Sequence, residues 1–227
     1  LKALQSGTGI DLVLTPTKKL VIHGEEGISQ KGSNNGNASH YFSQTRMNSR
    51  GRVWIKQTEY NITGTSWMDH EFSSNQLSKE HVGWDWFSIQ LDNNIEIMLY
   101  QIRLKNGGIE PLSSGTFIKS DGSHKSLKLK DFQIKPVEHW VSNKTQIEYP
   151  AGWKIDIPTE EIHLKIEPEV NKQELFDLRT IGSYWEGAVS ILGRYKGHVV
   201  KGNGYVELVG YGKALNTDST EAEKNKH

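Results

Sequence analysis

The chain has 227 residues, and its 27 Lys and Arg balance 27 Asp and Glu, so the formal net charge is zero. Nucleic-acid-binding proteins usually carry a basic surplus, so we expect no nucleic-acid partner. Cysteine is absent, which excludes disulfides, thiolate nucleophiles and cysteine–zinc sites. Mean hydropathy is −0.61 and the apolar runs are short, far below the about 20 residues of a spanning helix, so no transmembrane segment is expected.

The first half of the chain predicts short antiparallel strands that alternate with polar turns. An alternating run at 40–47, a polar segment at 48–51 and a second run at 52–55 indicate strand, turn and strand. Further along, runs at 84–91 and 95–104 flank Asp92-Asn93-Asn94, which predicts a hairpin with a short polar loop.

The second half continues this pattern, and only residues 172–178 indicate a short helix or 3₁₀ turn. Turns are predicted at residues 121–122 and 196–197. The candidate strands span residues 132–140, 153–157, 162–168, 184–193 and 198–210. Regularly spaced strands with glycine-rich turns are typical of an antiparallel sandwich or barrel, so the predicted fold class is all-β.

Two positions indicate where the chain divides. The segment 110–115 is small, polar and contains proline, which predicts a domain boundary at about residue 112. The last residues, 213–227, are polar and charged and are expected to form a disordered tail.

Candidate site residues gather in two alternating segments. In a strand, alternate side chains share a face, so Trp67, Asp69 and Glu71 are expected to point one way. By the same rule the second segment places Trp84 and Trp86 on one face with Ser88 and Gln90, while Asp85 shares the other face with apolar residues. Tyr100 lies on the partner strand of the predicted hairpin. A face that mixes aromatic and polar groups suits the lumen of a ligand-binding barrel.

Carboxyl groups beside aromatic rings suggest acid chemistry. Burial against rings raises a carboxyl pKa, so that the group can deliver a proton near neutral pH, and electron-rich rings stabilise a positive intermediate. This combination suits protonation of an alkene followed by capture of water, with Asp69, Glu71 and Asp85 as the candidate catalytic residues. The alternative is structural: the tryptophans form core, and Asp69 caps a turn or pairs with Arg46 or Arg103, which would lower its pKa.

The sequence lacks the usual motifs for metal binding, dinucleotide binding and nucleophilic catalysis. His23, His40, His70 and His81 lack metal-ligand spacing, so no metal site is predicted, although ligands assembled across strands are left open. The segment 202–204 precedes a predicted strand, not a helix, which argues against a dinucleotide loop. No nucleophile elbow is present, and no cofactor is expected.

Several strings of the sequence resemble one known family. They span residues 20–32, 67–72, 83–91, 98–103, 149–153, 184–189 and 204–211. In order and spacing they are similar to the AttH-like and carotenoid 1,2-hydratase group, and closer to its AttH-like branch, which carries a "secreted hydrolase" label. The resemblance covers roughly residues 10–212.

The resemblance implies two consecutive lipocalin-like β-barrels. Residues 1–112 would be the C-terminal part of the first barrel, with its earlier strands supplied before Leu1, and residues 113–212 would form the second. It further implies a bacterial, periplasmic or secreted protein, and a homodimer is left open.

The resemblance also implies a class of ligand. A hydrophobic, isoprenoid-like small molecule would be bound or hydrated without a cofactor at the junction of the barrels. Trp67, Trp84, Trp86, Gln90 and Tyr100 would bind it. Whether the protein is an enzyme stays open, because a lipocalin-type carrier without catalysis and a hydrolase are the alternatives.

Overall fold

The computed structural model describes residues 1–33, 36–73, 77–177 and 182–212, and these form two antiparallel sheets with two 3₁₀ turns. The predicted tail, 213–227, lies outside the described residues. The first sheet comprises β1 (Lys2–Gln5), β2 (Thr8–Pro16), β3 (Val21–Ile22), β4 (Ile28–Gln30), β5 (Ala38–Ile55) and β6 (Thr58–Phe72).

The second sheet has ten strands, in the order β10-β9-β8-β7-β16-β15-β13-β12-β11, with β14 beside β15. Its strands are β7 (His81–Leu91), β8 (Glu96–Leu104), β9 (Ser114–Ile118), β10 (His124–Lys128), β11 (Gln133–Val141), β12 (Glu148–Ile157), β13 (Ile162–Pro168), β14 (Glu174–Asp177), β15 (Gly182–Tyr195) and β16 (His198–Val209). The 3₁₀ turns are η1 (Leu129–Asp131) and η2 (Pro158–Glu160). The all-β, antiparallel, lipocalin-like prediction is confirmed.

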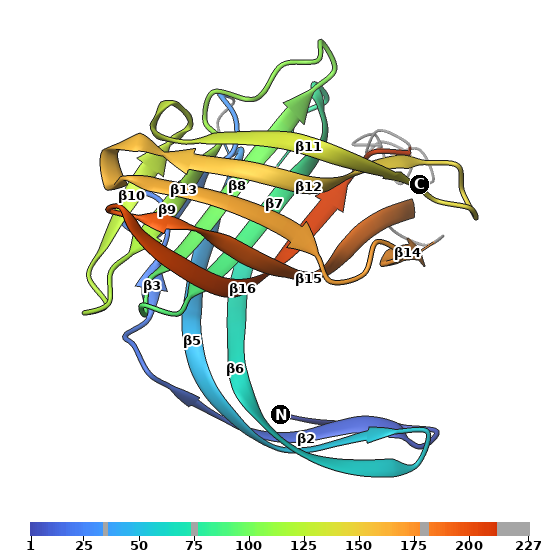
Figure 1. Ribbon diagram of the computed structural model, residues 1–227. Helices are drawn as coiled ribbons and strands as arrows, with labels where there is room; N and C mark the ends of the chain where they lie inside the picture. Colours follow the sequence, from blue (N-terminus) through green and yellow to red (C-terminus); the bar gives the residue numbers. More distant parts are fainter. Residues whose placement is uncertain (34–35, 74–76, 178–181, 213–227) are drawn as a thin grey trace, which may run out of the picture.

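The ten-stranded sheet curls on itself (Figure 1), and its strands supply most side chains of the main core. Strand alternation directs Phe87 and Ile89 of β7 inward, where Phe87 packs edge-on to Trp153 with ring centroids 5.6 Å apart. The opposite face of β7 and β8 carries a smaller cluster of Tyr100, Ile102 and partly buried tryptophans.

The long β5–β6 hairpin connects the two sheets. Its lower part pairs with β2, which in turn pairs with β1, and these strands form a separate curved layer; its upper part lies beside β7 (Figure 1). A register shift between Gln44 and Met47 interrupts the β5–β6 ladder midway, and such bulges bend a strand. The bulge therefore allows the upper part of the hairpin to bend away from the lower layer and pack against the second sheet.

Two local predictions are wrong. Residues 48–51 form no turn, because β5 runs continuously from Ala38 to Ile55 and pairs with β2 on one side and β6 on the other. Residues 174–177 are not helical but form β14, which pairs with β15, and residue 178 lies outside the described residues. In both segments, pairing with other strands of the sheet overrides the local turn or helix preference.

The chain passes from the first sheet to the second between Phe72 and His81. The boundary predicted at residue 112 falls between β8 and β9, which pair with one another in the ten-stranded sheet. The division of the chain into barrels at 1–112 and 113–212 therefore stays a prediction, since hydrogen bonding alone does not separate the strands there.

Candidate functional site

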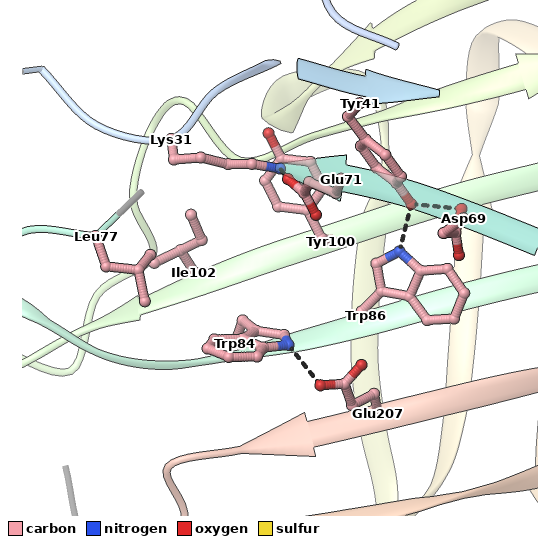
Figure 2. Close-up of a pocket in the computed structure, with 10 residues that line it drawn as sticks. All are labelled: Lys31, Tyr41, Asp69, Glu71, Leu77, Trp84, Trp86, Tyr100, Ile102 and Glu207. Carbon is pink, nitrogen blue, oxygen red and sulfur yellow. Dashed lines mark hydrogen bonds and ion pairs between the residues drawn. The ribbon is translucent and has the colours of Figure 1, made fainter. Parts of the chain in front are cut away.

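A cavity of about 200 Å³ lies where the β5–β6 hairpin packs on the outer face of β7, β8 and β16. Aromatic rings and carboxyl groups dominate its wall (Figure 2). The lining residues are Lys31, Tyr41, Asp69, Glu71, Leu77, Trp84, Trp86, Tyr100, Ile102 and Glu207. A neighbouring cleft shares Asp69, Trp86 and Glu207 with the cavity and continues past Trp67 and Gln90.

Asp69 of β6 receives hydrogen bonds from three side chains. The hydroxyl of Tyr41 and the indole N–H of Trp67 donate to its Oδ1 over 3.0 and 2.9 Å, and the Ser43 hydroxyl donates to the same atom. Desolvation by the surrounding protein raises the pKa of Asp69, which is the direction predicted for an acid beside aromatic rings. The three hydrogen-bond donors oppose this rise. The predicted alternative partners, Arg46 and Arg103, instead bind Glu96 and Asp85.

Tyr41 joins Asp69 to the ten-stranded sheet. Its ring is buried, and its hydroxyl accepts a hydrogen bond from Trp86 Nε1 over 3.0 Å while donating to Asp69 (Figure 2). Burial and the nearby Asp69 carboxyl raise the pKa of Tyr41 well above its ordinary value. The phenol therefore stays neutral and keeps its proton for the carboxylate.

A buried histidine, His23, is connected to Asp69 through the hydroxyl of Ser43. His23 Nε2 lies 2.7 Å from Ser43 Oγ and Nδ1 lies 2.8 Å from Thr116 Oγ1. Because the single Ser43 proton goes to Asp69, His23 must donate from Nε2 and accept at Nδ1. Burial lowers the pKa of His23 to about 3, so the ring is the neutral tautomer that this network requires.

The negative charge of Glu71, two residues after Asp69, is balanced by the cation of Lys31. Lys31, directly after β4, is buried and places its Nζ 2.9 Å from Glu71 Oε1 and 3.8 Å from the centroid of the Tyr100 ring. Ser39 also donates to Glu71 over 2.5 Å. The pair therefore adds little net charge to the cavity.

Glu207 of β16 forms the opposite wall and is not among the candidate residues predicted from the sequence. Its carboxyl accepts a hydrogen bond from Trp84 Nε1 over 3.2 Å (Figure 2). Burial raises the pKa of Glu207 to about 7, and the carboxyl of Glu186 on the adjacent strand adds to the rise. The only sequence signal was its position within residues 204–211, one of the strings that carry the family resemblance.

The structure brings together most of the predicted site residues. Asp69, Glu71, Trp84, Trp86 and Tyr100 all line the cavity. Trp67 lines the neighbouring cleft and meets Trp86 edge to face, with centroids 6.3 Å apart.

Two predicted residues lie elsewhere. Asp85 sits on the opposite face of β7, where Arg103 Nε is 3.1 Å from its Oδ1 and the Tyr211 hydroxyl also donates to it. Gln90 lines the neighbouring cleft and not the cavity, and its amide donates to the carbonyls of Thr45 and Ser66. Gln90 thus fastens the β5–β6 hairpin to β7.

The part of the chain that the structure describes holds no group of three or more His, Asp and Glu arranged to bind a metal ion. Within the same residues, no helix has the length and apolar character needed to cross a membrane.

Comparisons with known proteins agree with this architecture. The AttH-like family model matches residues 1–211, whereas no curated protein matches. An AttH protein from Nitrosomonas europaea is 30% identical with a TM-score of 0.84, and kievitone hydratase from Nectria haematococca is 18% identical with a TM-score of 0.76. Each match covers 93% of this chain and 64% of the other, so the chain spans less than two thirds of these structures. The family match over nearly the whole described chain shows that the protein belongs to the AttH-like family.

Proposed function

We propose that the cavity binds a hydrophobic, isoprenoid-like small molecule and adds water to one of its carbon–carbon double bonds without a cofactor. The observation that carries this proposal is the joint presence of aromatic rings and two carboxyls of raised pKa, Asp69 and Glu207, around one cavity. The hydratase activity named for the structurally similar protein from Nectria haematococca supports the reaction class.

The chemistry follows from the lining. Hydration needs an acid to protonate one alkene carbon, an environment that tolerates positive charge on the other carbon, and a water molecule that adds there. A raised pKa lets a carboxyl hold a proton near neutral pH, and the rings of Trp84 and Trp86 offer cation–π stabilisation. The neighbouring cleft gives water access to the same residues.

A labelled-water experiment tests the reaction. The protein is incubated with a lipid and terpenoid extract in ¹⁸O-water, and bound and released compounds are compared by mass spectrometry. We expect an unsaturated compound to be retained and to gain the mass of one labelled water. A compound returned unchanged would indicate a carrier instead, and label in a cleaved acid would indicate a hydrolase.

A matched pair of variants locates the binding site. Trp86→Ala removes a ring from the cavity wall, whereas Trp54→Ala removes a ring at the far end of β5, beside Arg52. Retention should fall at least about tenfold for Trp86→Ala and stay near wild type for Trp54→Ala, because buried aromatic anchors dominate binding energy. Equal retention by both variants would contradict binding in this cavity.

A further inference from the structure

The cavity has one carboxyl group on each of two facing walls. Asp69 comes from β6 of the six-stranded sheet, and Glu207 comes from β16 of the ten-stranded sheet. Both line the cavity and its neighbouring cleft, with Trp86 between them (Figure 2). When two titratable groups share a site, the difference between their surroundings decides which one holds the proton.

The surroundings of Asp69 favour the carboxylate. Its Oδ1 accepts from Tyr41, Ser43 and Trp67, and a carboxylate gains more from such donors than a neutral acid does. Asp69 also lies exposed on β6, which among the described strands pairs with β5 alone, so water reaches part of its side chain. Both features oppose protonation.

The surroundings of Glu207 favour the neutral acid. It is half-buried, and among the described residues it accepts a side-chain hydrogen bond from the N–H of Trp84 over 3.2 Å. The cross-strand partners of Glu207 are Trp86 on β7, an apolar ring, and Glu186 on β15, a second carboxyl. The titratable and charged groups that surround Glu207 are Glu186, Tyr205, Asp69, Glu71, Tyr41 and Lys31. Lys31 is neutralised by Glu71, so the balance around Glu207 is acidic.

We propose that Glu207 is the general acid of this cavity and that Asp69, assigned that role from the sequence, is its ionised partner. This inference rests on the proposed hydration. The Glu207 O–H bond breaks as its proton adds to one alkene carbon, and the π electrons form the new C–H bond. Water adds to the resulting cation through a lone pair, and Asp69 takes the proton that this water loses. The product is an alcohol, and the cycle closes when Asp69 releases its proton to solvent and Glu207 regains one.

Benzyl vinyl ether is a suitable probe, because its hydrolysis begins with proton transfer to a carbon of its double bond. Water then adds, and the hemiacetal breaks down to benzyl alcohol and acetaldehyde. Binding is followed by quenching of tryptophan fluorescence, and turnover by release of acetaldehyde. We expect wild-type turnover above the buffer rate that is constant below about pH 7 and falls at higher pH, since Glu207 must be protonated.

Four variants separate the roles. Glu207→Gln should lose about 10²–10⁴-fold of the rate while still binding the probe, and Glu207→Asp should recover part of it. Glu186→Gln removes the neighbouring carboxyl that raises the pKa of Glu207, so it should move the pH midpoint downward and keep the rate below it. Asp69→Asn should slow turnover and lower the midpoint only slightly, because the Asp69 carboxylate is the smallest contributor to the raised pKa of Glu207.

The opposite pattern overturns the inference. A midpoint that persists in Glu207→Gln, or that disappears in Asp69→Asn, would return the acid role to Asp69. Binding without turnover above buffer would remove acid catalysis while leaving ligand binding in place. If the wild-type protein does not bind the probe, the proposed function fails together with the inference.

Discussion

Replacement of Glu96 by Gln should destabilise the contact between the two sheets. Glu96 begins β8 and is fully buried, and its carboxylate receives Lys18 Nζ at 2.6 Å and Arg46 Nε at 2.5 Å. Lys18 precedes β3 and Arg46 lies in β5, so the three charges join the first sheet to the second. Without the carboxylate, two largely buried cations remain without their counter-ion.

The expected loss in the free energy of unfolding follows from the hydrogen bonds that Glu96→Gln removes. Two charge-assisted hydrogen bonds contribute about 1.5–3 kcal/mol each, or about 3–6 kcal/mol together. In the variant, Lys18 still donates hydrogen bonds to the carbonyls of Asn94 and Lys119, and Arg46 still donates to that of Leu91. We therefore expect a loss of unfolding free energy at the low end of this range, about 3 kcal/mol. For a chain of this size that corresponds to a Tm lower by about 6–12 °C.

Thermal and urea unfolding of Glu96→Gln beside a matched control measures this effect. The control is Lys165→Met, because the pair of Lys165 and Glu167 has a 2.5 Å contact but is half exposed on both sides. It should leave the unfolding midpoints close to those of wild type, because an exposed ion pair contributes little to stability. If Glu96→Gln unfolds within the error of wild type, or if both variants lose the same stability, the argument from burial is refuted.

Three further predictions concern the site and the core. First, the fold raises the pKa of Glu207 to about 7, so ionisation of this carboxyl opposes folding. The free energy of unfolding of wild type should therefore fall by up to about 3 kcal/mol relative to Glu207→Gln as pH rises from about 4.5 to 7. Parallel urea titrations at pH 4 and 8 check this, and an unchanged difference between the two proteins would contradict it. Second, Tyr41→Phe removes one of the donors to Asp69 and should raise the Asp69 pKa, measured by carbon-detected NMR titration; a lower pKa would show that the hydroxyl does not stabilise the carboxylate. Third, Phe87→Ala empties a fully buried position against Trp153 and should cost about 3–5 kcal/mol in urea unfolding, whereas a loss below 1 kcal/mol would mean that the core collapses to fill the space.

Local patterns were sufficient for most of the second sheet. The run at 162–168 is β13, and the predicted turns at Asp121-Gly122 and Lys196-Gly197 join paired strands. These features depend on side-chain alternation and on residues that tolerate tight turns, and both are properties of adjacent positions.

The first sheet shows where local patterns fail. Asn48 to Gly51 has the composition of a turn, yet Gly51 lies within β5, where a Cβ would come 2.1 Å from the carbonyl oxygen of Asp11 in β2. The glycine thus permits a close strand contact. The chain reverses instead at Lys56 and Gln57, which adopt φ of 48° and 70° although neither residue type favours such a turn.

For the site, alternation predicted which residues share a face but not what each face meets. It separated Trp84 and Trp86 from Asp85, but the β5–β6 hairpin decides that the tryptophan face borders the cavity and leaves Asp85 to Arg103. A shift of one residue in the β7 register would exchange these positions, because side chains alternate with period two. The face that receives the ligand is therefore a property of sheet packing, which no single strand encodes.

The choice of acid depends on the same packing. Trp84 and Glu207 are 123 residues apart, and only the pairing of β7 with β16 brings the indole N–H to the carboxyl. From the sequence, Asp69 beside Trp67 was the better candidate, because a carboxyl next to a ring suggests desolvation. In the structure that same ring supplies an N–H that stabilises the Asp69 carboxylate, while Glu207 faces the apolar ring of Trp86 and the carboxyl of Glu186. A neighbouring tryptophan therefore does not identify the acid by itself: an indole N–H stabilises a carboxylate, and Glu207 keeps its proton because burial and the Glu186 carboxyl outweigh the one N–H that Trp84 donates.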